Sequence, residues 1–151
     1  MIKEKYQEIF EKAYQKFKIA DRMAYVSFSI LGESRLFIKI LEELYKSTTY
    51  LISALLQYEY SQKNITLYKD PKLNLKVFKE KVALKYLDEN ELENLIKILL
   101  IGKKHQNSEM EFVKNNKFVI LINDQYEVLT IERLKEFISL LRKILLRTKF
   151  E

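Results

Sequence analysis

The side chain in this sequence best suited to chemistry is His105, the single histidine of the chain. It follows Lys103 and Lys104 and precedes Asn107 and Ser108, where a helical pattern gives way to a polar stretch. An imidazole acts as a general base near neutral pH, and a neighbouring lysine can hold a phosphate. The segment therefore predicts either a catalytic histidine for metal-independent RNA cleavage or a histidine that stabilises a helix C-terminus.

Positive charge is concentrated in the last predicted helix. Lys135, Arg142 and Lys149 recur every seven residues, so they lie along one edge of that helix. Such a row suits the phosphates of a nucleic-acid backbone, while the alternative is a solvated face whose cations interact with the helix dipole. The basic residues of this candidate nucleic-acid surface are Arg133, Lys135, Arg142, Lys143, Arg147 and Lys149. Two tyrosines, Tyr60 and Tyr68, could stack bases, although tyrosines more often bridge a core and its wet rim.

Composition excludes several kinds of site. The chain has 151 residues, no cysteine and only two glycines, which excludes disulfides, thiolate catalysis and glycine-rich phosphate loops. With one histidine and no Glu-x-x-His pair, a di-iron bundle is rejected, and we expect neither a metal nor a cofactor. The net charge is +6, and outside the last predicted helix basic and acidic residues are mixed along the chain. Because no apolar run approaches the about 20 residues of a membrane span and no secretory signal is visible, we expect a cytoplasmic protein without a membrane partner.

The candidate residues must be positioned by helices. Two long runs, Lys3–Leu31 and Ser34–Lys63, repeat apolar residues every three and four positions, with Gly32 and Glu33 between them. This pattern predicts two long antiparallel helices, with Gly32 as the left-handed residue after the first and Ser34 as the cap of the second. The seam of the first helix comprises Tyr6, Phe10, Ala13, Phe17, Ala20, Ala24, Ser27 and Leu31.

The remaining elements are shorter. Asp70, Asp88 and Thr130 each stand where an N-cap is expected, and Glu91 completes a capping box with Asp88. β-branched and aromatic runs around Asn123–Gln125 predict a hairpin. The predicted segments are helices at Leu73–Tyr86 and Glu89–Lys104, strands at Lys117–Ile122 and Tyr126–Leu129, and a last helix that begins at Ile131. The fold class is therefore mainly α: one antiparallel bundle of about five helices over residues 1–151, with a small β-hairpin before the last helix.

This order of elements resembles the HEPN superfamily of helical bundles. The stretches Ala20–Val26 and His105–Ile120 look like a degenerate archaeal-type branch, and the resemblance covers nearly the whole chain. HEPN ribonucleases carry an arginine that is separated from the histidine by four to six intervening residues, whereas Ile98, Leu99 and Leu100 occupy those arginine positions here. The resemblance therefore implies a single HEPN-like domain without ordinary ribonuclease activity. It implies a module that binds RNA, a nucleotide or a partner protein, often as a dimer.

Three hypotheses from different classes follow. The first is a non-catalytic HEPN-like module that binds RNA or a nucleotide through Lys103–Ser108 and the basic last helix. The second is a homodimer, or a holder for another protein, with no role in nucleic-acid binding. Leu140 and Leu146 lie off the main seam of the last helix and would mark such an interface. The third is a metal-independent ribonuclease that uses His105 as its base.

Overall fold

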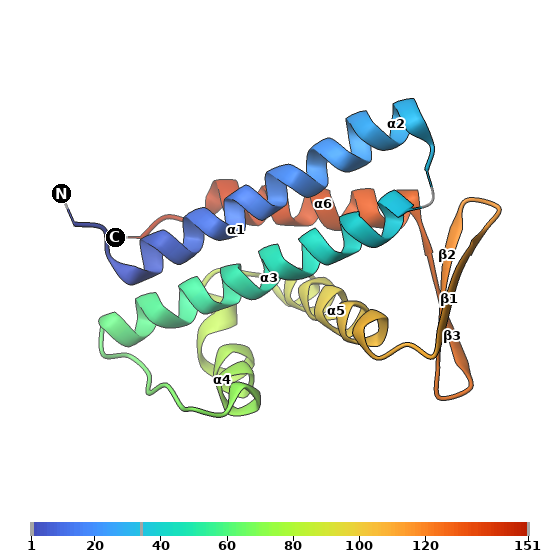
Figure 1. Cartoon of the computed structure of the whole chain (residues 1–151). Coiled ribbons are helices and arrows are strands. Elements are labelled where there is room, and N and C mark those ends of the chain that lie inside the picture. Colours follow the sequence, from blue (N-terminus) through green and yellow to red (C-terminus); the bar gives the residue numbers. More distant parts are fainter. Residues whose placement is uncertain (1, 34, 151) are drawn as a thin grey trace.

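Two long antiparallel helical segments form the centre of the fold, as predicted. The computed structural model describes residues 2–33 and 35–150. Figure 1 shows the first segment and α3 running side by side in opposite directions. The first segment is continuous but contains a π-helical turn, η1, between two α-helical parts. The bounds are α1 (Lys5–Arg22), η1 (Met23–Ser27), α2 (Phe28–Leu31) and α3 (Arg35–Ser61).

The junction between these two segments is built around a glycine. Gly32 has a φ of 60°, which an L side chain rarely adopts, and its N–H donates to the carbonyl oxygen of Phe28 at 2.8 Å. This confirms Gly32 as the residue that ends the first helix. Ser34, the predicted cap of the second helix, lies outside the described residues.

The seam predicted for the first helix is correct up to Ala24 and wrong for Leu31. Ala24 is fully buried, whereas Leu31 is 60% exposed. A π-helical turn takes up more residues than an α-helical turn, so the residues after η1 are out of phase with those before it. Phe28 consequently packs against Phe37 of α3, with ring centroids 5.2 Å apart.

Three further helical segments follow with the predicted caps. The Asp70 carboxylate accepts from Lys72 N–H at 2.9 Å, the Asp88 carboxylate from Glu91 N–H at 2.8 Å, and the Thr130 hydroxyl from Arg133 N–H at 3.1 Å. Satisfying these free N–H groups explains why the helices begin at these residues. The segments are α4 (Pro71–Val77) with its continuations η2 (Phe78–Val82) and η3 (Ala83–Lys85), then α5 (Glu89–Gln106) and α6 (Ile131–Arg147).

The sheet has one strand more than predicted. Antiparallel strands lie in the order β1-β2-β3, so the predicted hairpin is β2–β3 and β1 pairs on the other side of β2. Both connections are two-residue turns, Asn115–Asn116 and Asn123–Asp124, in which every φ lies between 51° and 62°. Asn and Asp tolerate this left-handed conformation, which matches the twist of a hairpin. The bounds are β1 (Met110–Lys114), β2 (Lys117–Ile122) and β3 (Gln125–Thr130).

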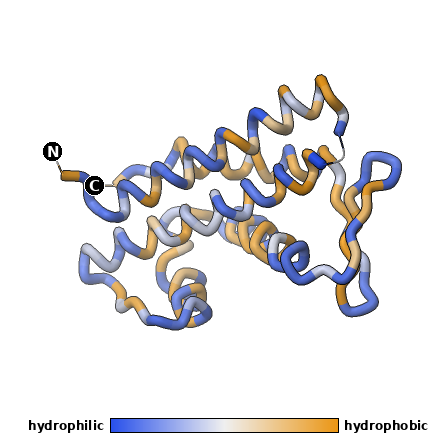
Figure 2. Tube along the Cα trace, viewed as in Figure 1, coloured by the Kyte–Doolittle hydropathy of each residue, from blue (hydrophilic) through white to orange (hydrophobic). Residues whose placement is uncertain are grey.

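The sheet closes one end of the bundle (Figure 1). Its inner face buries Phe118, Ile120 and Leu129, and the ring of Phe118 stacks 6.5 Å from that of Phe37 on α3. Figure 2 shows that the turns at both ends of the sheet are hydrophilic. No helix within residues 2–33 and 35–150 is both long and apolar enough to cross a bilayer.

Candidate functional site

His105 lies in the last turn of α5 and contacts a carboxylate on the sheet. Its Nδ1 is 2.8 Å from one oxygen of Glu111 and 3.0 Å from the other. The hydroxyl of Ser108 contacts the same carboxylate and lies 3.1 Å from the backbone oxygen of His105. The side chains of His105 and Glu111 are only 17% and 19% exposed. The cluster therefore joins the end of α5 to β1.

This geometry orients the histidine, but it does not bring the predicted lysines to it. A carboxylate at Nδ1 leaves Nε2 as the atom that would accept a proton. The ammonium of Lys104 instead contacts Glu127 of β3 at 3.2 Å. The amide of Asn107 donates to the backbone oxygen of Lys103 at 3.0 Å and so caps α5. Catalysis by His105 remains a prediction, and sequence analysis did not identify Glu111 as its partner.

The contact between His105 and Glu111 can be measured as a coupling energy. We expect His105→Ala and Glu111→Ala each to lower the free energy of unfolding by about 1 kcal/mol, because either change removes the hydrogen bond between α5 and β1. The double variant should lose little more than either single variant, which urea denaturation measures. Strictly additive losses would show that the two side chains do not stabilise one another.

Most cations of α6 contact neighbouring elements. The guanidinium of Arg142 lies 2.5 Å from the carboxylate of Asp21 on α1 and over the ring of Phe17 at 5.5 Å. The ammonium of Lys135 lies 4.8 Å from the ring centre of Tyr25. These contacts pack α6 against the first helical segment, so the predicted row of cations also has a structural role.

Arg147 donates three hydrogen bonds to groups outside α6. Its guanidinium donates to both oxygens of Glu91 at 2.8 and 3.0 Å and to the backbone oxygen of Tyr86 at 2.9 Å. The ammonium of Lys143 lies 3.9 Å from the same carboxylate. Hydrogen bonds from Arg147 lower the pKa of Glu91 despite its burial, and the carboxylate in turn raises the pKa of Arg147. Lys149 lies beyond the end of α6 and is exposed.

One groove does bring together cations from both predicted segments. It lies between α5, β3 and the first turn of α6 and has a volume of about 470 Å³. Lys104 of α5 and Arg133 of α6 both line it, although they are far apart in the sequence. We call it the α5–β3 groove. Its lining residues are Lys97, Leu100, Ile101, Lys104, Arg133 and the four residues 127–130.

The groove adds residues that sequence analysis missed. Lys97, Leu100 and Lys104 are spaced three and four residues apart, so they share one face of α5. That spacing is the sequence signal that could have identified this face. Tyr60 and Tyr68, the candidate base-stacking residues, are 52% and 49% exposed and do not line the groove.

Neither a metal site nor similarity to a known protein points to a function for the described part of the chain. Within the described part of the chain, no group of three or more histidine, aspartate or glutamate side chains could hold a metal ion. Comparisons with protein-family models, curated proteins and solved structures found no match to this chain. The HEPN relationship therefore remains a prediction that rests on the sequence.

Proposed function

We propose that this protein is a non-catalytic HEPN-like module that binds RNA or a nucleotide, and that the phosphate binds in the α5–β3 groove. The supporting observation is that Lys104 and Arg133, one from each predicted binding segment, line one groove together with Lys97. Glu127 is the one carboxylate among the residues that line the groove, and Lys97 also lies 3.7 Å from Glu93 on α5. The volume of about 470 Å³ falls within the range of about 300–1,000 Å³ typical of small-ligand pockets.

The lining of the groove suits both parts of a nucleotide. Leu100 lines the groove and is 56% exposed, so it offers an apolar surface for a base. The first turn of α6 lies at the groove, and the N-terminal end of a helix favours an anion. Lys104 already contacts Glu127, and Arg133 contacts Glu136 at 2.8 Å, but these pairs are partly solvated. Partly exposed ion pairs contribute little to stability, so a phosphate can compete for both cations.

The proposal predicts salt-dependent binding that depends on these two cations. We expect Lys104→Ala/Arg133→Ala to weaken binding of a labelled single-stranded RNA at least about tenfold, because two phosphate contacts are lost. The slope of log K against log salt should also fall by about 1.4, since each phosphate contact contributes about 0.7 with single strands. Fluorescence anisotropy at several salt concentrations measures both quantities.

The matched control is Lys79→Ala/Lys81→Ala. It removes the same charge from two exposed lysines of η2 that do not line the groove. This control should bind as the wild type does. An equal loss of RNA affinity in the two double variants would contradict a specific binding groove. If the wild-type protein binds neither RNA nor ATP at low salt, the proposed function itself is wrong.

A further inference from the structure

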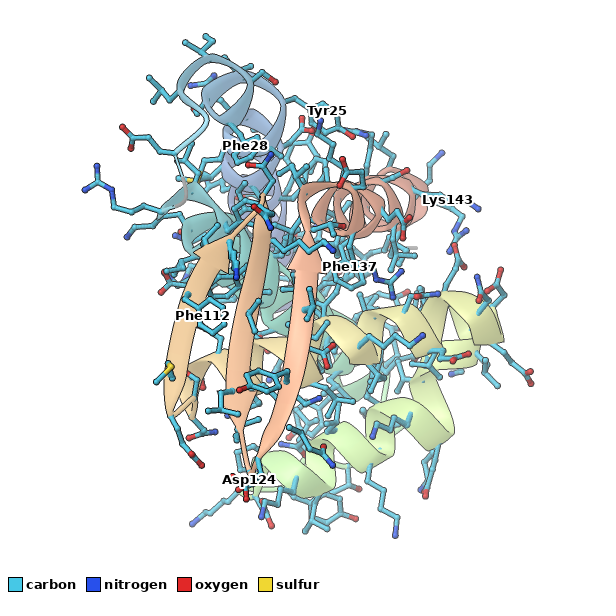
Figure 3. All side chains as sticks on the ribbon, turned by 90° about the vertical axis from the view of Figure 1, so that its right-hand side faces the viewer. Tyr25, Phe28, Phe112, Asp124, Phe137 and Lys143 are labelled. Carbon is cyan, nitrogen blue, oxygen red and sulfur yellow. The ribbon has the colours of Figure 1, made fainter. Side chains whose placement is uncertain are left out.

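The face of the sheet that points away from the bundle carries two rows of apolar side chains, each row running across the three strands. Side chains alternate along a strand, and Phe118, Ile120 and Leu129 point into the core, so their neighbours point outward. Figure 3 views this face directly. By the strand register, one row contains Met110, Leu121 and Tyr126, and the next contains Phe112, Val119 and Val128. We call these six residues the outer sheet face.

The outer sheet face is exposed to an extent that is unusual for such residues. Tyr126 is 64% exposed, Met110 57%, Val128 50% and Phe112 39%. Single exposed apolar residues are common, whereas these adjoining ones form one continuous apolar patch across three strands.

Opposite charges flank the outer sheet face. Lys114 and Lys117 pair with each other in the next row, beside the β1–β2 turn. Asp124 lies in the β2–β3 turn at the other end (Figure 3), and Glu109 immediately precedes β1 at that same end. All four side chains are exposed. The surface therefore has an apolar centre, a basic end and an acidic end.

We propose that the outer sheet face binds the same face of a second copy of this chain, in a symmetric dimer. A symmetric dimer uses the same patch on both copies, and sheets pack face to face by interdigitating apolar side chains about 10 Å apart. Such a patch is self-complementary when its two ends carry opposite charges. A two-fold axis that crosses the strands places the lysine end of each copy over the acidic end of the other.

The charges also decide the orientation of the two copies. An axis parallel to the strands would place Lys114 and Lys117 over the same lysines of the other copy, which is unfavourable. With the axis across the strands, each strand runs antiparallel to its equivalent. The row that contains Met110 in one copy then faces the row that contains Phe112 in the other.

The size of the face sets the strength of the dimer. Three strands about 4.8 Å apart and five residues of about 3.4 Å cover roughly 250 Å². This is less than the about 800 Å² that each partner contributes to a standard interface. We therefore expect weak, reversible dimerisation that depends on protein concentration.

Sedimentation equilibrium over a range of concentrations tests the proposal. We expect Met110→Glu/Phe112→Glu to weaken dimerisation at least about tenfold, because the charges would be buried without partners. Neither residue lines the α5–β3 groove, so ligand binding should persist and the two proposals can fail separately. The matched control is Leu146→Glu, at a site on α6 that is 64% exposed, close to the 57% of Met110; it should dimerise as the wild type does.

A charge exchange keeps the test informative if a face variant does not fold. Lys114→Glu/Lys117→Glu should weaken the dimer at least about tenfold. Adding Glu109→Lys and Asp124→Asn should restore part of the lost affinity, because the end that faces the new glutamates then carries a positive charge. Restoration cannot arise from unfolding, and it is specific to the antiparallel arrangement. A wild-type protein that stays monomeric throughout the range, dimers that ignore the face variants, or a monomeric Leu146→Glu variant would each overturn the proposal.

Discussion

Replacement of Glu91 by alanine is expected to lower the free energy of unfolding by about 3 kcal/mol. Glu91 is only 4% exposed and accepts two hydrogen bonds from the guanidinium of Arg147. Its carboxylate also accepts from the N–H of Asp88, the N-cap of α5. The substitution therefore removes the pair that joins α5 to α6 together with half of a capping box. Urea denaturation followed by circular dichroism measures the loss.

The contribution of Glu91 should also depend on pH in a defined direction. Arg147 holds the pKa of this carboxyl below its ordinary value of 4.5 in the folded state. A lowered pKa contributes stability above the unfolded pKa and loses it as the pH falls through the folded pKa. The difference in stability between the wild type and Glu91→Gln should therefore be constant near neutral pH and shrink below about pH 4.5. A difference that stays constant into strong acid would contradict this interpretation.

A matched control comes from the neighbouring cation. Lys149→Ala removes a charge from an exposed residue just beyond α6 and should change stability by no more than about 0.5 kcal/mol. Arg147→Ala should instead be strongly destabilising, because it leaves the buried carboxylate of Glu91 without its main partner. Equal effects of these two substitutions would mean that Arg147, like Lys149, belongs to a solvated face.

Gly102→Ala is expected to lower the free energy of unfolding by about 2 kcal/mol, although alanine favours helices. A Cβ at position 102 would lie 2.2 Å from Cδ2 and 2.8 Å from Cγ of Tyr45. These atoms lie near the base of the tyrosine side chain, so α3 or α5 must shift to admit the methyl group. Thermal and urea denaturation of the single variant measure the cost.

The sign of this effect should reverse when the tyrosine is removed. In a Tyr45→Ala background, Gly102→Ala should raise stability by up to about 1 kcal/mol, because alanine is a better helix former than glycine. Tyr45→Ala alone supplies the reference. If Gly102→Ala destabilises both backgrounds equally, close packing against Tyr45 is not the reason for this glycine.

Local sequence signals were enough to predict the helices, whereas the strand β1 forms only because it pairs with β2. The caps at Asp70, Asp88 and Thr130 are contacts within one turn, so the sequence alone locates them. β1 has five residues, two of them charged, so its apolar run is weaker than that of β2. Its strand conformation comes from pairing with β2, which is a tertiary contact.

The candidate site shows the same division. The basic composition of α6 is visible in the sequence, but the carboxylates that contact it, Asp21 and Glu91, lie in other helices. Counting charges along one helix cannot reveal these pairs. Lys104 and Arg133 line the same groove only because of the way in which α5 and α6 pack against β3. The face of α5 that carries Lys97 and Leu100 could have been identified from spacing, but its position beside Arg133 could not.

The π-helical turn Met23–Ser27 gives the first helix a site where its length can change. A π turn is the form that an α-helix takes when it absorbs one extra residue without breaking. The residues before it, Lys5–Arg22, keep their packing on α3 whatever happens beyond this point. Loss or gain of a single residue here would rotate the last turn and so change which of its side chains faces Phe37 of α3, the place that Phe28 now takes. Insertions and deletions in this helix should therefore be tolerated better beside the exposed Val26 than within Lys5–Arg22.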